Sequence, residues 1–218
     1  KLARHVPTGI EVAVKVIDRH GSNRPYREVQ SMKSLNHPNI VKLFVVIDTK
    51  NTLFLIMENV DGGNLSAYLQ DCGGMTECEA RGVFRQLISV VHYCNQMGIV
   101  HRDLKPHNIL LDADRNVKQA AFGLSNEYVG RKLTTFCGSL NYVAPGIILG
   151  RSYDGPGADV WSLGVILFKM VCRRLPFVSD NLRELGRKVI RGQYRLPFFI
   201  SSHLADLIGK CLTVDPCH

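Results

Sequence analysis

The sequence predicts an α+β fold with two lobes, a small β-rich N-terminal lobe and a larger α-helical C-terminal lobe. Short apolar runs separated by polar turns fill the N-terminal part of the chain. Apolar residues at helical spacing fill the remainder, and Asp61-Gly62-Gly63 separates the two patterns. We therefore expect residues 1–60 to form the first lobe and residues 61–218 the second.

The N-terminal part contains the signals for three strands and one helix. Residues 10–17 alternate apolar and polar side chains, as a half-buried strand does. Residues 43–47 and 53–57 are apolar runs joined by a polar turn, which predicts a β-hairpin. Between these strands, residues 25–35 predict a short helix, and Pro38 disfavours its continuation.

Four longer helices are predicted in the C-terminal part. Thr76 and Glu79 have the spacing of a capping box, and apolar residues follow them at the 3.6-residue period. A helix over residues 158–172 is apolar on every side, so we expect it to be buried. The other two are an amphipathic basic helix over residues 182–191 and a helix over residues 202–212.

Composition excludes several classes of protein. With 45% apolar and 21% charged residues, the 218-residue chain has the composition of a globular domain and not of a disordered one. The longest unbroken apolar runs are far shorter than the roughly 20 residues of a membrane-spanning helix, so we expect no membrane span. Seven scattered cysteines and no recognisable signal peptide favour a reduced, intracellular and cytoplasmic protein.

The chain is basic, with 27 Lys and Arg against 19 Asp and Glu and a net charge of +8. Such a charge is compatible with a nucleic-acid partner. No dense basic run and no zinc-finger spacing accompanies it, so we expect no nucleic-acid role. The alternative is a basic surface or a pocket for acidic ligands.

The strongest chemical signal is the stretch His101-Arg102-Asp103-Leu104-Lys105-Pro106-His107-Asn108. It resembles the catalytic loop of protein kinases. The resemblance implies that Asp103 accepts the proton of the substrate hydroxyl, Lys105 steadies the transferring phosphate and Asn108 binds a metal ion. The Lys-Pro pair after Leu104 is typical of the serine/threonine branch.

Further motifs follow in the order that protein kinases have them. Residues 12–15, Val-Ala-Val-Lys, resemble the strand that carries the phosphate-binding lysine, and Glu28 lies on the helix that would supply its ion-pair partner. The chain is most similar to the microtubule-affinity-regulating kinases and their AMP-activated and sperm-motility-kinase relatives. The stretches that carry this closer resemblance are residues 1–5, 35–44, 135–139 and 153–156. Residues 122–123, 142–145 and 159–164 resemble motifs of protein kinases in general.

The resemblance implies an ATP site with Mg²⁺ between the lobes. Lys15, paired with Glu28, would grip the α- and β-phosphates. Ala13 and Leu110 would flank the adenine ring. The remaining residues implied for this pocket are Glu58 and Val60, which would present hinge backbone to adenine, and Met57, which would control access behind it.

The resemblance also implies regulation and partners. Thr135 matches the activation-segment threonine that an upstream kinase phosphorylates, and Ser139 would form a hydrogen bond near Asp103. Met32, Leu43, His101 and Phe122 match the apolar stack that links the lobes. The implied partner is a protein substrate or, for an inactive domain, a scaffold partner.

The chain departs from the family pattern at two acidic positions. Where the family has Asp-Phe-Gly, this sequence has Ala121-Phe122-Gly123, so the metal-binding aspartate is absent and Asn108 alone would hold a metal ion. Where the family has Ala-Pro-Glu, this sequence has Ala144-Pro145-Gly146, so the glutamate is replaced by glycine. The segment between Asp18 and Glu28 is also a few residues shorter than in the relatives. Apolar patterning survives while acidic residues are lost, which is typical of a degenerate copy.

We also expect truncation at both ends, without the first strand, the Gly-rich loop and the final helices of the family fold. Three functions then remain open. The first is a pseudokinase that transfers phosphate very poorly. The alternatives are an active serine/threonine kinase and a non-catalytic scaffold that binds the partners of active relatives.

Overall fold

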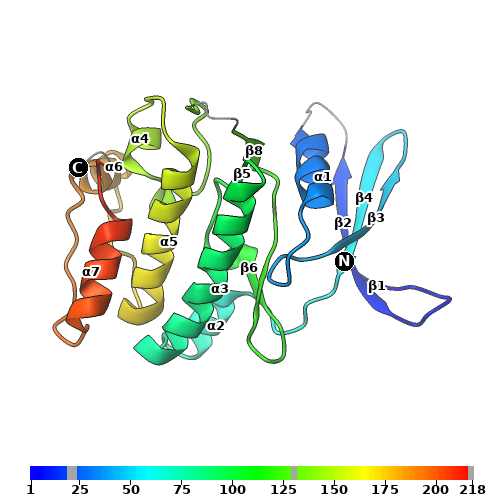
Figure 1. Cartoon of the computed structure of the whole chain (residues 1–218), viewed down its shortest axis with the longest axis horizontal. Coiled ribbons are helices and arrows are strands. Elements are labelled where there is room, and N and C mark those ends of the chain that lie inside the picture. The colour runs from blue at the N-terminus through cyan, green and yellow to red at the C-terminus, as the bar shows by residue number, and fades with distance from the viewer. Residues whose placement is uncertain (19–23, 129–131, 216–218) are drawn as a thin grey trace.

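The computed structural model describes residues 1–18, 24–128 and 132–215. It has the two lobes that the sequence predicts (Figure 1). The N-lobe contains a four-stranded antiparallel sheet in the order β1-β2-β4-β3, with one helix beside it. Its elements are β1 (Leu2–Arg4), β2 (Glu11–Asp18), α1 (Arg24–Ser34), β3 (Leu43–Asp48) and β4 (Thr52–Glu58).

Alternation along the strands decides which residues form the N-lobe core. Leu53 and Leu55 of β4 are buried against Val29 and Met32 of α1. The intervening positions face the other side of the sheet, where Val45 and the other outward residues of β3 are exposed. The predicted helix and three strands are present with bounds shifted by a residue or two. The short strand β1, which pairs with β2, had no periodicity that would have predicted it.

The C-lobe is mainly helical (Figure 1). Its helices are α2 (Leu65–Asp71), α3 (Glu77–Gln96), α4 (Pro145–Ile148), α5 (Gly155–Cys172), α6 (Leu182–Arg191) and α7 (Ser202–Cys211). The C-lobe also contains two small antiparallel strand pairs, β5 (Ile99–Val100) with β8 (Asn126–Glu127) and β6 (Ile109–Leu111) with β7 (Val117–Gln119). Short 3₁₀ turns occupy Pro106–Asn108 and Leu140–Tyr142.

Helix α5 forms the centre of the C-lobe, between α3 and α7 (Figure 1). Its buried Trp161 stacks on Phe177, with ring centroids 5.8 Å apart and planes 8° from parallel. Among the described residues, α5 is the one helix long and apolar enough to cross a membrane, and 78% of that window is buried inside the fold. Burial on all sides explains its uniformly apolar sequence.

The helix ends follow local capping chemistry. The capping box of α3 is confirmed, because Thr76 Oγ1 accepts from the Glu79 N–H at 3.3 Å and Glu79 Oε2 accepts from the Thr76 N–H at 2.9 Å. The predicted start of α5 at residue 158 was wrong. The Asp154 carboxylate caps the helix by accepting from the Gly157 N–H at 2.7 Å, and Pro156 is tolerated in the first turn, where its missing N–H costs no hydrogen bond.

Candidate active site

Lys15 and Glu28 form an ion pair across the N-lobe. The alternation of β2 points Lys15 toward α1, where the ammonium lies 2.6 and 2.7 Å from the two carboxylate oxygens of Glu28. Glu28 is buried, whereas the Lys15 side chain is 38% exposed, so the pair is shielded from solvent on the glutamate side only. A Cβ atom at Gly123 would lie 3.3 Å from Glu28 Oε2, so glycine leaves the room that this carboxylate uses. The shorter segment before α1 therefore does not prevent the pair, although residues 19–23 lie outside the described residues.

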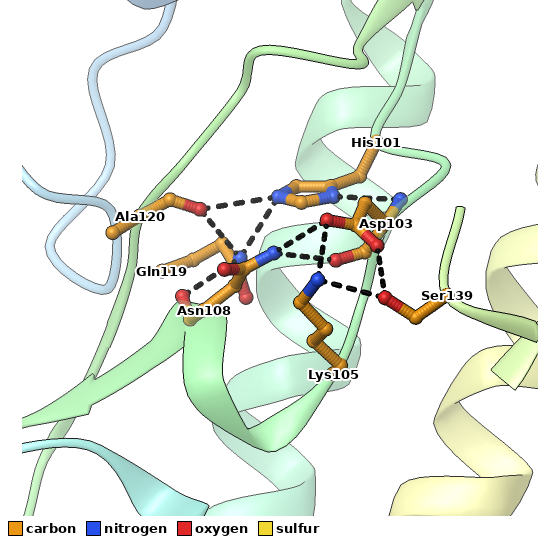
Figure 2. A network of polar contacts seen from close by, with 7 residues as sticks. All are labelled: His101, Asp103, Lys105, Asn108, Gln119, Ala120 and Ser139. Carbon is orange, nitrogen blue, oxygen red and sulfur yellow. Dashed lines mark hydrogen bonds and ion pairs between the residues drawn. The ribbon is translucent and has the colours of Figure 1, made fainter. Parts of the chain in front are cut away.

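Asp103 is held by three side chains (Figure 2). Its Oδ1 accepts from the Ser139 hydroxyl at 3.0 Å, as the sequence predicted. Its Oδ2 accepts from the Asn108 amide at 3.0 Å and pairs with the Lys105 ammonium at 3.0 Å. The Lys105 ammonium also donates to Ser139 at 2.7 Å, which closes the network. Both oxygens of Asp103 therefore have partners, and the carboxylate is oriented before any substrate arrives.

The loop that carries Asp103 is anchored to α5 by Asp159. The two carboxylate oxygens of Asp159 accept from the main-chain N–H groups of His101 and Arg102, each at 2.8 Å. Burial raises the pKa of Asp159 to about 6, although both hydrogen bonds favour its charged form. Sequence reasoning did not assign Asp159 to the site. A lone carboxylate inside an apolar helix was the signal that could have found it.

His101 is buried behind the loop, with its ring 4.9 Å from the ring of Phe122. Burial lowers the pKa of His101 to about 4, so the ring is neutral at pH 7. Phe122 packs in the N-lobe cluster with Met32, and Leu43 lies at the edge of the same cluster. The apolar stack that the sequence predicted therefore joins the two lobes.

Ala121 lies where the family has its metal-binding aspartate. Its backbone adopts a left-handed conformation with φ 61°, which is unusual for a residue other than glycine, asparagine or aspartate. Its methyl side chain offers no oxygen to a metal ion. Among the described residues, no group of three His, Cys, Asp or Glu side chains could hold a metal ion. The Asn108 amide nitrogen donates to Asp103, so the amide oxygen is the one atom of this side chain that could bind a metal ion. The residues present therefore do not fit Mg²⁺, which prefers several oxygen ligands in octahedral geometry.

The residues implied for the adenine pocket come from both lobes. Ala13 pairs with Met57 across β2 and β4, and Val60 follows the end of β4. Leu110 lies on β6 in the C-lobe and is half-buried. Glu58 does more than continue the strand, because its carboxylate lies 2.6 Å from the Lys118 ammonium of β7. This ion pair crosses between the lobes, and sequence reasoning had not found Lys118.

The segment with Thr135 lies along the C-lobe. Thr135 is exposed, and its main-chain carbonyl accepts from the buried Tyr153 hydroxyl at 3.1 Å. Leu133 and Tyr153 form a β-bridge nearby. Gly146 also meets Tyr153, because a Cβ atom added there would lie 3.3 Å from the Tyr153 Cβ. Tyr153 thus contacts both the threonine segment and the site of the missing glutamate.

The two lobes, the paired Lys15 and Glu28, and the Asp103 loop between them are the features of a protein kinase domain. The protein kinase domain family matches residues 1–218, and the chain belongs to this family. Over 222 aligned residues, covering 99% of this chain, it is 48% identical to serine/threonine-protein kinase SIK1 of Mus musculus and 47% identical to SIK1 of Rattus norvegicus. It is 46% identical to serine/threonine-protein kinase SIK2 of Gallus gallus over the same length. The chain spans 28% to 29% of the length of these curated relatives.

Proposed function

We propose that this domain is a pseudokinase, which keeps the kinase fold and much of the site but transfers phosphate from ATP very poorly. The observation that carries the proposal is Ala121, which places a methyl group where the family places a metal-binding carboxylate. The family reaction depends on metal ions to neutralise the charge of the transferring phosphoryl group. Losing one charge-stabilising group commonly costs about 10²–10³-fold in rate, and we expect a loss of at least about 10³ here.

The other parts of the site support binding of a nucleotide. Lys15 is oriented by Glu28 and would contact the α- and β-phosphates. Ala13 and Leu110 would cover the adenine ring, Glu58 and Val60 would present backbone to its edge, and Met57 would limit the space behind it. ATP is the ligand that the family implies, and we extend it to this chain with residues 1–60 and 61–218 as the two lobes around it.

A working kinase is the second candidate, and the Asp103 network favours it. Asp103, Lys105 and Ser139 form one connected group of hydrogen bonds and an ion pair. A domain without catalytic activity would not require this arrangement, so its presence favours an active kinase. In this alternative Asp103 would accept the proton from a serine or threonine hydroxyl of a protein substrate. Thr135, which is exposed, would be available to an upstream kinase.

The test is transfer of labelled phosphate from ATP, with Mg²⁺ present, to a generic basic peptide. The chain is compared with Asp103→Ala, which removes the base, and with Ala121→Asp, which restores the carboxylate. We expect the chain to match Asp103→Ala and Ala121→Asp to exceed both by about 10²–10³-fold. Transfer by the unmodified chain well above Asp103→Ala would overturn the pseudokinase proposal and establish the working kinase.

A scaffold role and a cytoplasmic location belong to the same proposal. A domain without transfer activity can still bind the protein partners of active relatives, and co-purification with such partners that is independent of ATP would support this. The six cysteines that the structure describes are free thiols, which favours a reducing compartment. Redox-sensitive labelling of these thiols in cell extracts tests the location.

A further inference from the structure

Gln119 is a fully buried polar residue next to the catalytic loop (Figure 2). It is the last residue of β7, and its main chain is fixed from the N-lobe side. Its N–H donates to the Asn39 carbonyl at 2.7 Å, and its carbonyl accepts from the Val41 N–H at 3.0 Å. The side chain therefore has little freedom to leave the site, and its amide must be accommodated there.

Two carbonyl groups determine how the Gln119 amide is turned. Its nitrogen lies 2.8 Å from the Ala120 carbonyl oxygen and 3.1 Å from the Asn108 carbonyl oxygen. Both neighbours can only accept, so the nitrogen and not the oxygen must face them. The amide oxygen is buried and has no hydrogen-bond partner among the described residues. A buried polar atom without a partner is costly, which indicates that the hydrogen bonds of the amide nitrogen outweigh the cost of leaving the amide oxygen without one.

The same nitrogen also contacts the ring of His101. Gln119 Nε2 lies 2.8 Å from His101 Nε2, while the Asp103 main-chain nitrogen lies 3.2 Å from His101 Nδ1. Both Gln119 and the Asp103 main chain are donors, and a neutral ring has a single nitrogen that accepts. One of the two contacts must therefore be a hydrogen bond and the other a contact between donors.

The Gln119 amide nitrogen carries two hydrogens but faces three acceptors. The Ala120 carbonyl and His101 Nε2 each lie 2.8 Å away and take them, whereas the Asn108 carbonyl, at 3.1 Å, is left without a hydrogen of its own. The distances thus favour Gln119 as the donor to the ring. A contact between two donors is less costly at 3.2 Å than at 2.8 Å, and the shorter contact has the length of a good hydrogen bond. The Ala120 carbonyl, the other neighbour of His101 Nε2, is more distant from it at 3.2 Å. We propose that Gln119 is a positioning residue that donates to His101 Nε2, holds the ring proton on Nδ1 and so deprives the Asp103 main-chain N–H of its acceptor.

This inference deepens the proposed function. The hydrogen bond from Gln119 to His101 is independent of that function, but its effect on phosphate transfer rests on it. The Asp103 carboxylate keeps its bonds to Ser139, Asn108 and Lys105, but its backbone loses the hydrogen bond that the His101 ring would supply. Gln119 would then be a second cause of weak phosphate transfer, independent of Ala121.

The experiment reads the ring nitrogens directly by ¹⁵N–¹H correlation NMR of the ¹⁵N-labelled chain at pH 7. Protonated and unprotonated ring nitrogens give well-separated ¹⁵N signals, and those of His101 are assigned by their absence in His101→Gln. We expect Nδ1 to be protonated and Nε2 to be unprotonated in the unmodified chain. In Gln119→Met, which keeps a long unbranched side chain without the amide, we expect the proton to move to Nε2.

Gln86→Met is the matched control. Gln86 is also a glutamine bonded to β7, through the Val117 N–H at 2.8 Å, but its side chain is not among the contacts of His101. We expect this variant to leave the His101 signals unchanged. A ring protonated on Nε2 in the unmodified chain would overturn the inference, even if Gln119→Met failed to fold. The spectrum requires no phosphate transfer, so its outcome is separate from that of the proposed function.

Discussion

At Ala121 the missing carboxylate is only half of the effect, because the backbone there is also strained. The residue adopts φ 61°, a conformation that glycine, asparagine and aspartate accept more readily than alanine. The neighbouring Phe122 is completely buried, so packing imposes the conformation on Ala121. The substitution that removed a metal ligand therefore also introduced a cost in stability.

We predict that Ala121→Gly raises the free energy of unfolding by about 0.5–1 kcal/mol, because glycine adopts positive φ without a steric penalty. Urea unfolding of both chains measures the difference. Ala67→Gly is the control, since Ala67 is exposed within α2 and glycine should destabilise a helix by about 0.5–1 kcal/mol. A loss of stability in Ala121→Gly like that in the control would contradict the argument.

At the scale of elements, the junction of α5 with the catalytic loop contains two buried titratable groups with opposing effects. Asp159 has a pKa raised to about 6 from 3.8, so above pH 6 the folded chain holds a buried carboxylate at a cost. Its contribution to stability therefore falls as the pH rises from 4 to 6. His101 has a pKa lowered to about 4 from 6.5, so its contribution rises over nearly the same range.

These two contributions should nearly cancel in the unmodified chain between pH 4 and pH 6. We predict that Asp159→Asn unmasks the histidine, so that the free energy of unfolding rises by a few kcal/mol from pH 4 to pH 6.5, at about 1.4 kcal/mol for each pKa unit. Urea unfolding across this range measures it. A profile in Asp159→Asn that is parallel to that of the unmodified chain would show that Asp159 does not titrate in this range.

Most of the elements could be predicted from the sequence, and the failures have local causes. The helix over residues 182–191 was predicted with the bounds it has, because its apolar face and its C-terminal Gly192 are both visible in the sequence. The start of α5 was misplaced, because Gly155 and Pro156 look like helix breakers until the Asp154 cap is seen. Strands of two or three residues, such as β5 and β6, are too short to show a period.

Site residues could be predicted where they belong to a short sequence motif. They could not be predicted where only folding brings them together. Asp103, Lys105 and Asn108 stand in one short stretch of sequence, and Ser139 was found from a second stretch. Gln119 and Lys118 stand in no recognised motif, and the stretch over residues 159–164 gave Asp159 no role in the site. The partners of these residues lie elsewhere in the sequence, and only the fold brings them together. Gln119 in particular looks like an ordinary polar residue until its complete burial is known.

At the scale of the whole molecule, the Glu58–Lys118 pair is a contact between lobes beside the proposed nucleotide pocket. The carboxylate also accepts from the Lys42 N–H at 3.1 Å, so it is held in place when it meets the lysine. Both side chains are largely shielded from solvent, at 19% exposed for Lys118 and 26% for Glu58. The attraction should therefore be screened less than at the surface.

We predict a coupling energy of about 1–2 kcal/mol in a double-mutant cycle with Glu58→Gln and Lys118→Met, measured by urea unfolding. The exposed pair Arg4–Glu11 is the control, because its atoms are 3.1 Å apart but solvent surrounds them. In a cycle with Arg4→Met and Glu11→Gln we expect no measurable coupling. Equal coupling in the two cycles would mean that shielding between the lobes adds nothing.

The stacked Trp161 and Phe177 give the chain a built-in optical reporter of one lobe. Trp161 is the single tryptophan of the sequence and is buried on α5, a helix that lies away from the N-lobe sheet in Figure 1. Tryptophan emission will therefore follow the loss of the C-lobe core. It will not change if the N-lobe sheet unfolds separately. Far-ultraviolet circular dichroism follows both lobes, so any gap between the two unfolding curves measures how independently the lobes unfold.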